Sequence, residues 1–149
     1  MIRISLAAIC AVFLSLTASW AQSTLVASAE TNVTGITTSQ VMISRNTHHV
    51  LMGHFFVVER DGELVRALRV HQRRDGVHRL RFDEAWSSGT ALPFTGPARP
   101  TDGCVFGQCR DIYVGTIFFS EGLFDRAQRS GLSARLVGPS GAVQIAAPA

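Results

Sequence analysis

The chain has 149 residues, of which 46% are hydrophobic and 17% are charged, and its formal net charge at pH 7 is +3. This length suffices for one domain with a hydrophobic core. The excess of basic residues is too small and too dispersed for a nucleic-acid-binding surface, so we expect no nucleic-acid partner.

Residues 1–21 have the pattern of a secretory signal peptide. Arg3 provides a positive charge, the stretch from Ile4 to Leu16 is apolar, and small residues favour cleavage after Ala21. The apolar stretch is shorter than the roughly 20 residues that cross a bilayer. We therefore expect a bacterial protein that is periplasmic or secreted, with no transmembrane segment once the signal is removed.

The predicted cleavage divides the three cysteines. Cys10 leaves with the signal peptide, and the alternative, a lipoprotein modified at Cys10, is disfavoured by the bulky Ile9 before it. Cys104 and Cys109 remain in a single β-rich exported domain over residues 22–149, and in an oxidising compartment we expect them to form a disulfide. Redox-active dithiols and zinc knuckles favour closer spacing, so the sequence favours them less.

The first half of the domain predicts strands. Residues 22–47 are rich in serine and threonine and predict one or two short edge strands or a partly ordered arm. Asp-Gly between β-rich segments is typical of a two-residue hairpin turn, in which both residues have positive φ. We expect a three-stranded meander in which two such pairs separate three segments: 54–60, Asp61-Gly62, 63–74, Asp75-Gly76 and 77–83.

The two turns also predict the register of the meander. Across the first turn Val58 faces Val65, and across the second turn His71 faces Leu80. Opposed residues share a face, and side chains alternate along each strand. We expect the core to lie against the face that carries Phe56, Val58, Val65, Ala67, Leu80 and Phe82.

The second half of the domain mixes a loop with further regular elements. Residues 86–111 carry many glycines and prolines and predict a long loop, which at this length is more often functional or flexible than inert. Residues 112–119 predict a buried strand. A helix is expected over 121–130, with Ser120 as its N-cap and Gly131 as its end, and a last hairpin over 132–137 and 142–146.

These elements predict a mostly β fold. The expected architecture is an antiparallel β-sandwich or a partly open barrel with one short helix in the C-terminal half, and an α+β roll is the alternative. The last third of the chain, with Cys104 and Cys109, the helix and the Gly-turn hairpin, resembles the end of invasion-associated locus B-type periplasmic proteins. That resemblance follows a pattern rather than a specific motif and implies no function for this chain.

The predicted meander brings three histidines to one face. His71 lies opposite Met52 and Leu80, which places His54 and His78 on its two diagonals, about 7–8 Å away. Three imidazoles on one sheet face could hold zinc or copper, with Met52 as a soft neighbour for copper(I). The alternatives are solvated histidines at the rim of the sheet and a pH-sensing role.

Arginines gather on the opposite face of the same meander. Arg66, Arg79 and Arg81 share this face with Glu59 and Asp83. One interpretation is a solvated face with cross-strand ion pairs. The functional interpretation is an anion-binding or partner-binding face for a polysaccharide, a lipid headgroup or an acidic protein.

The chain offers no convincing catalytic motif. Gly138–Ala142 superficially matches a nucleophile elbow, but it lacks the final glycine and lies in a predicted hairpin, so a small hydrolase is only the second alternative. We expect a non-catalytic exported domain that binds an envelope protein or polysaccharide, with no cofactor. The first alternative is a periplasmic metal-binding protein that holds zinc or copper through His54, His71 and His78.

Overall fold

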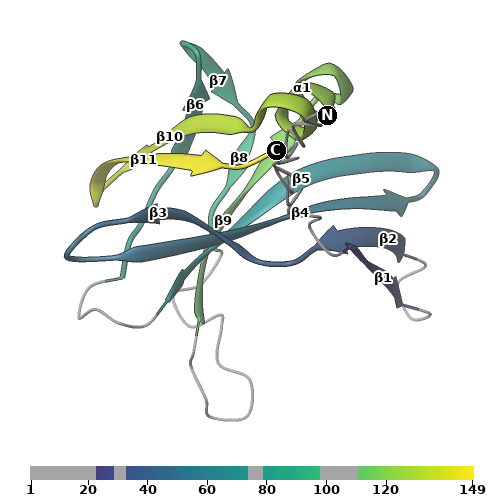
Figure 1. Ribbon diagram of the computed structural model, residues 1–149, viewed down its shortest axis with the longest axis horizontal. Coiled ribbons are helices and arrows are strands. Elements are labelled where there is room, and N and C mark those ends of the chain that lie inside the picture. The colour runs from purple at the N-terminus through teal and green to yellow at the C-terminus, as the bar shows by residue number, and fades with distance from the viewer. Residues whose placement is uncertain (1–22, 29–32, 74–78, 98–110) are drawn as a thin grey trace, which may run out of the picture.

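The computed structural model describes residues 23–28, 33–73, 79–97 and 111–149, which form two antiparallel sheets and one short helix (Figure 1). The larger sheet contains β1 (Ser23–Ser28), β2 (Val33–Thr38), β3 (Val41–Arg45), β4 (Val50–Arg60), β5 (Glu63–Arg73), β8 (Phe94–Thr95) and β9 (Asp111–Phe119). The smaller sheet contains β6 (Glu84–Ser87), β7 (Thr90–Leu92), β10 (Leu132–Gly138) and β11 (Gly141–Ala147), and the helix is α1 (Glu121–Ser130). The described strands do not close into a barrel, and the predicted β-sandwich-like fold is confirmed.

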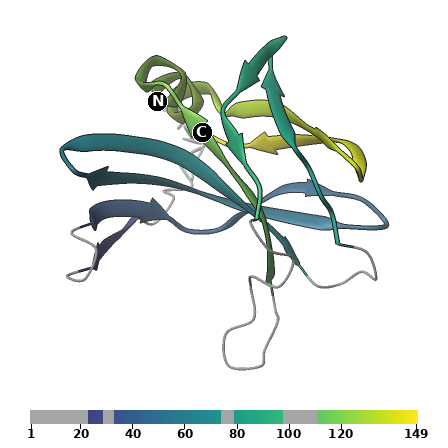
Figure 2. The ribbon, with the colours of Figure 1, turned by 180° about the vertical axis from the view of Figure 1, so that it is seen from behind.

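The two sheets are layered. The larger sheet has the strand order β1-β2-β4-β5-β9-β8, with β3 also paired to β4, and the smaller sheet has the order β11-β10-β6-β7. The smaller sheet and α1 lie on the same side of the larger sheet in both views (Figures 1 and 2). One face of the larger sheet therefore borders the core, and we call the opposite face the outer face.

The hairpin of β4 and β5 is the structural centre of the larger sheet. Its observed register pairs Val58 with Val65 and Met52 with His71, as the sequence predicts. Asp61 and Gly62 form the turn with φ values of 53° and 82°, which match the positive φ that this two-residue turn requires.

A substitution in this turn tests its contribution to stability. We expect Gly62→Ala to lower the free energy of unfolding by about 1 kcal/mol, because alanine is strained at positive φ. No atom lies within 4 Å of a Cβ at this position, so the cost isolates the backbone conformation. Urea denaturation measures it, with the exposed neighbour Glu63→Ala as a control, and an unchanged midpoint for Gly62→Ala would contradict the prediction.

The predicted third strand of the meander is wrong. The described part of 77–83 is irregular, and β9 occupies the position next to β5. The nine residues of β9 are half-buried or buried throughout, so pairing β9 at this position covers far more apolar surface than the short, Arg-rich segment would. The segment still crosses the end of β5, where the backbone N–H of Leu80 donates to Oε1 of Gln72 at 2.9 Å.

The predicted core face of β4 and β5 is also wrong. Leu51, Leu68 and Val70 are fully buried and point toward the smaller sheet, whereas Phe56 and Val58 lie on the outer face and are half-buried. Both faces of the hairpin carry apolar residues, so the alternation of apolar and polar residues does not show which face is buried. Of the residues expected in the core, Phe82 is buried there and Leu80 packs against it, but both lie outside the strands, and Ala67 is buried on the outer face.

Two other segments contain more strands than predicted. Residues 22–47 contribute three strands, β1 to β3, rather than one or two. The described part of the predicted loop 86–111 holds the end of β6 together with β7 and β8, and Ser88-Gly89 turns the chain between β6 and β7 with φ values of 49° and 78°. The Ser-Gly pair is itself a turn signal, which the surrounding prolines and glycines obscured.

The last third of the chain follows its prediction. β9, α1 and the β10–β11 hairpin occupy their expected places, and Gly131 ends the helix with φ 76° while its N–H donates to Ala127. Ser120 holds the N-cap position, although its side chain makes no capping hydrogen bond. The rings of Phe55, Phe119 and Phe124 lie with centroids 5.9–6.2 Å apart and join the helix to the larger sheet.

Two predictions fall on segments that the structure does not describe. The predicted signal peptide over residues 1–21 and the predicted disulfide between Cys104 and Cys109 lie outside the described residues and stay predictions. Within the described ranges, no helix has the length and apolar character needed to cross a membrane.

Candidate functional site

Two methionines, a histidine and a tyrosine form a row across the outer face of the larger sheet. Met42 of β3 is paired with Met52 of β4, Met52 with His71 of β5, and His71 with Tyr113 of β9. Directly paired residues share a face of the sheet, so these four side chains lie on one side. Ile43 and Leu51, their neighbours in the chain, are buried on the core side, which confirms the direction of the row.

His54 lies beside this row and stacks on His71. Their ring centroids are 5.4 Å apart with an angle of 16° between the planes, so the prediction that the two histidines are diagonal neighbours on one face is confirmed. Nδ1 of His54 and Nε2 of His71 are buried and have no hydrogen-bond partner among the described residues. A buried nitrogen without a partner is costly, and Nε2 of His49, outside this pair, has the same status among the described residues.

The surroundings lower the pKa of both imidazoles. Burial is the main cause for His54, followed by His71 and Arg69, and together they lower its pKa to about 4. Burial and then Arg69 lower the pKa of His71, while Asp111 acts in the opposite direction. Both rings are therefore neutral at pH 7, so each carries one nitrogen lone pair.

Arg69 and Tyr113 border the histidine pair. Arg69 is paired with His54 across the hairpin, and its guanidinium carbon lies 5.4 Å from the centre of the Tyr113 ring. The Tyr113 hydroxyl is 2.8 Å from the Thr116 hydroxyl and donates to the Thr95 carbonyl at 3.3 Å. These contacts hold a positive charge next to the two neutral imidazoles.

The third predicted metal ligand is not part of this cluster as the structure describes it. His78 lies outside the described residues. Among the described residues, no three histidine, cysteine, aspartate or glutamate side chains are placed to hold one metal ion. Among the described residues, the thioethers of Met42 and Met52 are further candidate ligands on the same face.

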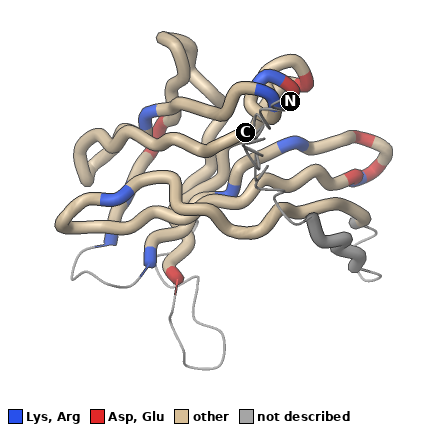
Figure 3. Tube along the Cα trace, viewed as in Figure 1, with Lys and Arg blue, Asp and Glu red and all other residues tan. Residues whose placement is uncertain are grey.

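The predicted arginine face does not form. Arg66 points toward the helix, where its Nη2 lies 3.3 Å from Oε1 of Glu121, and its side chain is only 19% exposed. Arg79 and Arg81 are exposed but belong to the irregular segment before β6 rather than to a strand beside β5. Basic positions are scattered over both sheets and their connections (Figure 3). The three arginines do not lie on one surface, and their role in binding stays a prediction.

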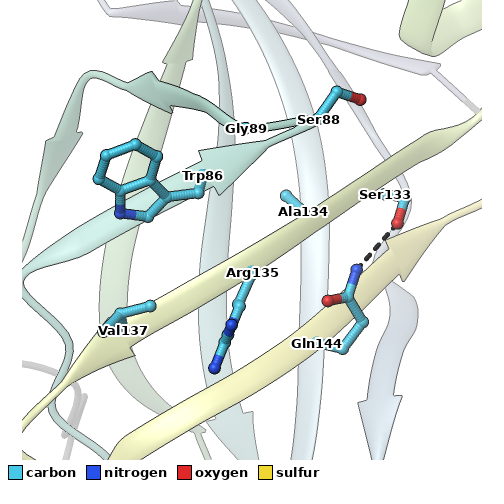
Figure 4. A pocket seen from close by; sticks show the side chains of 8 residues that line it. All are labelled: Trp86, Ser88, Gly89, Ser133, Ala134, Arg135, Val137 and Gln144. Atoms are coloured by element: carbon cyan, nitrogen blue, oxygen red, sulfur yellow. Dashed lines mark hydrogen bonds between the residues drawn. The ribbon is translucent and has the colours of Figure 1, made fainter.

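A shallow, open pocket of about 510 Å³ lies on the smaller sheet (Figure 4). Arg135 of β10 is paired with Trp86 of β6 on one side and with Gln144 of β11 on the other, so the three side chains form a row across the exposed face. The pocket is completed by neighbouring residues of the same strands and of the β6–β7 turn: Ser88, Gly89, Ser133, Ala134 and Val137.

Hydrogen bonds hold part of this row in place. Nε1 of Trp86 donates to Oε2 of Glu84 at 2.8 Å, and Nε2 of Gln144 donates to Oγ of Ser133 at 2.9 Å. The guanidinium of Arg135 and the amide oxygen of Gln144 have no partner within the described part of the chain. Trp86 is 38% exposed, which is unusual for so large an apolar side chain.

Sequence reasoning missed this row. The sequence pattern places Trp86 in the predicted loop 86–111, and Arg135 and Gln144 carry no motif because they are isolated polar residues in a hairpin. The alternation of the last hairpin already places Arg135 and Gln144 on its polar face. Only the pairing of β6 with β10, which joins segments far apart in the sequence, brings Trp86 beside them.

Known proteins offer no analogy for either cluster. Comparison of this chain with models of protein families, with curated proteins and with solved structures finds no match, so no family supports the resemblance of its last third, and both clusters are interpreted from their own geometry.

Proposed function

We propose that this protein is an exported, non-catalytic domain that binds an envelope polysaccharide through the exposed face of its smaller sheet. The observation that carries the proposal is the row of Trp86, Arg135 and Gln144 on a face that no described element covers (Figure 4). Export rests on the signal peptide predicted over residues 1–21, which would deliver the domain to the compartment where such polymers occur.

The tryptophan suits a sugar ring. A pyranose ring has a face of C–H groups that packs on an indole, whose ring is large, rigid and apolar. The hydrogen bond from Nε1 of Trp86 to Glu84 fixes the plane of the indole and satisfies its only polar group. The exposed faces of the ring are therefore available for stacking.

Arg135 and Gln144 suit the polar edge of the same sugar. The guanidinium of Arg135 presents several N–H donors in one plane and pairs well with a carboxylate. The amide oxygen of Gln144 accepts a hydrogen bond from a hydroxyl group. An open, shallow surface fits a chain that runs along the sheet, and the free arginine favours a polymer that contains uronic acids.

Binding to alginate oligosaccharides, a chain of uronic acids, tests the proposal. We expect binding by isothermal titration calorimetry, with a loss of about tenfold or more in affinity for Trp86→Ala and for Arg135→Gln. Trp86→Phe should retain most of the affinity because it keeps an aromatic face.

Two controls distinguish binding at this site from non-specific binding. Leu64→Ala removes an exposed apolar side chain of the larger sheet and should leave binding unchanged. Dextran, a neutral polymer, should bind more weakly than alginate, because it offers no carboxylate to Arg135. Absence of binding to both polymers, or equal binding by wild type and Trp86→Ala, would refute the proposal.

A further inference from the structure

We infer that the outer face of the larger sheet binds a copper(I) ion through His54, His71, Met52 and Met42. This inference goes beyond the proposed function, because the four residues lie on the other sheet and use a different chemistry. We call them the His–Met cluster.

The backbone pairing places both methionines on the same face as the histidines, on strands β3 and β4 beside β5. Met42 is directly paired with Met52, and Met52 is directly paired with His71. Directly paired residues on one face have Cβ atoms about 4.5–5.5 Å apart, which is within reach of a flexible methionine side chain. Met42 is 51% exposed, so its thioether can move toward the pair without leaving a packed position.

The histidines supply the firm half of the cluster. Their ring centroids are 5.4 Å apart, and because an imidazole binds an ion in its own plane, rotation of one ring about its χ2 angle would bring one nitrogen of each to a common ion. Nδ1 of His54 and Nε2 of His71 are the nitrogens without a partner in the described residues. A bound ion would satisfy both nitrogens, which the protein otherwise leaves buried at a cost.

The ligand set favours copper(I) over zinc. Thioethers are soft ligands that select copper(I), whereas zinc prefers cysteine, histidine and carboxylate side chains. The guanidinium of Arg69, which is paired with His54, repels any cation at this place. That repulsion grows with the charge of the ion, so it disfavours a divalent ion more than a monovalent one.

Titration of the full chain with copper(I) against a chromophoric copper(I) chelator tests the inference. Ascorbate under argon keeps the copper reduced, and prior treatment with N-ethylmaleimide blocks free thiols, which would otherwise compete as ligands. We expect one copper(I) ion per chain. His54→Gln and His71→Gln should each weaken binding by about a hundredfold, because loss of a ligand costs at least as much as loss of a supporting residue.

The methionine variants distinguish copper(I) from zinc and keep the inference falsifiable if a histidine variant fails to fold. Met52→Leu preserves the volume of the side chain and should weaken copper(I) binding by about tenfold while leaving zinc binding unchanged. Met42→Leu should act in the same direction. Arg69→Gln should raise the affinity for zinc more than the affinity for copper(I).

His48→Gln is the matched control, because His48 is exposed and lies outside the His–Met cluster. Trp86→Ala should also leave copper(I) binding unchanged, so failure of the polysaccharide proposal and failure of this inference can be told apart. The inference is overturned if the wild-type chain does not bind copper(I), if zinc binds more tightly than copper(I), or if Met52→Leu and Met42→Leu both bind as the wild type does.

Discussion

Replacement of Leu68 by alanine is expected to lower the free energy of unfolding by about 3–4 kcal/mol. Leu68 lies in the middle of β5, is fully buried, and is paired with Phe55 of β4 and Ile117 of β9. Its side chain points toward the smaller sheet, so its removal leaves a cavity between the layers that strands paired on both sides cannot close. Chemical denaturation followed by far-ultraviolet circular dichroism measures the change.

A substitution at Gly53 provides a second test of how tightly Leu68 is packed. A Cβ at position 53 would lie 3.0 Å from Cδ1 of Leu68 and 3.1 Å from two methyl carbons of Ile43. We therefore expect Gly53→Ala alone to destabilise the protein by about 1 kcal/mol through overpacking. In a chain that also carries Leu68→Ala, the added methyl group occupies part of the new cavity.

A double-mutant cycle measures this coupling. The destabilisation by both substitutions together should be smaller than the sum of the two separate effects, with a coupling of about 1 kcal/mol. Leu64→Ala serves as the control on the same strand, because Leu64 is 52% exposed and its loss should cost less than about 0.5 kcal/mol. Strict additivity of Leu68→Ala and Gly53→Ala would show that the two side chains do not share this space.

The parts of the fold that could be predicted from the sequence are those determined by local chemistry. The β4–β5 hairpin follows from Asp61-Gly62, since the turn needs two residues that accept positive φ and thereby sets the pairing of both strands. The end of α1 at Gly131 follows from the same tolerance. These signals act within a few residues and do not depend on the rest of the chain.

The parts that could not be predicted depend on distant partners. Asp75-Gly76 has the same turn sequence, but the long apolar strand β9 pairs with β5 instead of the segment that follows this turn. Arg79 and Arg81 therefore do not lie on one sheet face with Arg66. The buried face of the hairpin likewise depends on where the smaller sheet lies, and no alternation within β4 or β5 shows that position.

The two candidate clusters also combine residues brought together by local pairing with residues brought together by distant pairing. His54 and His71 meet because both lie in one hairpin with a predictable register. Met42 joins them through β3, and Trp86 joins Arg135 through β6, and neither strand has a strong pattern of its own. Both proposed sites therefore lie where short, weakly patterned strands pair with well-defined hairpins.

The metal-free protein is expected to lose stability as the pH falls from about 6.5 to about 4, since the pKa of His54 is lowered to about 4. In the unfolded chain the imidazole has its ordinary pKa near 6.5. Between these two values the unfolded state binds more protons than the folded state, so protonation favours unfolding. The stabilisation by neutral His54 is fully present above pH 6.5 and is lost as the pH approaches 4.

The size of this effect follows from the shift in the pKa of His54. A change from 6.5 to about 4 corresponds to about 3 kcal/mol, which partial contact with solvent reduces to about 2 kcal/mol. His71 contributes in the same direction, because burial and Arg69 lower its pKa, although Asp111 opposes them. Carboxylates add their own pH dependence near pH 4, so a variant comparison is needed to isolate the histidines.

Urea denaturation at intervals between pH 4 and pH 7.5, in the presence of a metal chelator, measures the histidine contribution. The free energy of unfolding of His54→Gln should vary less with pH than that of the wild type, because glutamine does not titrate. The exposed Leu64 provides the control, and Leu64→Ala should keep the wild-type slope because it removes no titratable group. If His54→Gln and the wild type lose stability in parallel over this range, then the position of His54 on the sheet does not lower its pKa, and the predicted pH dependence is wrong.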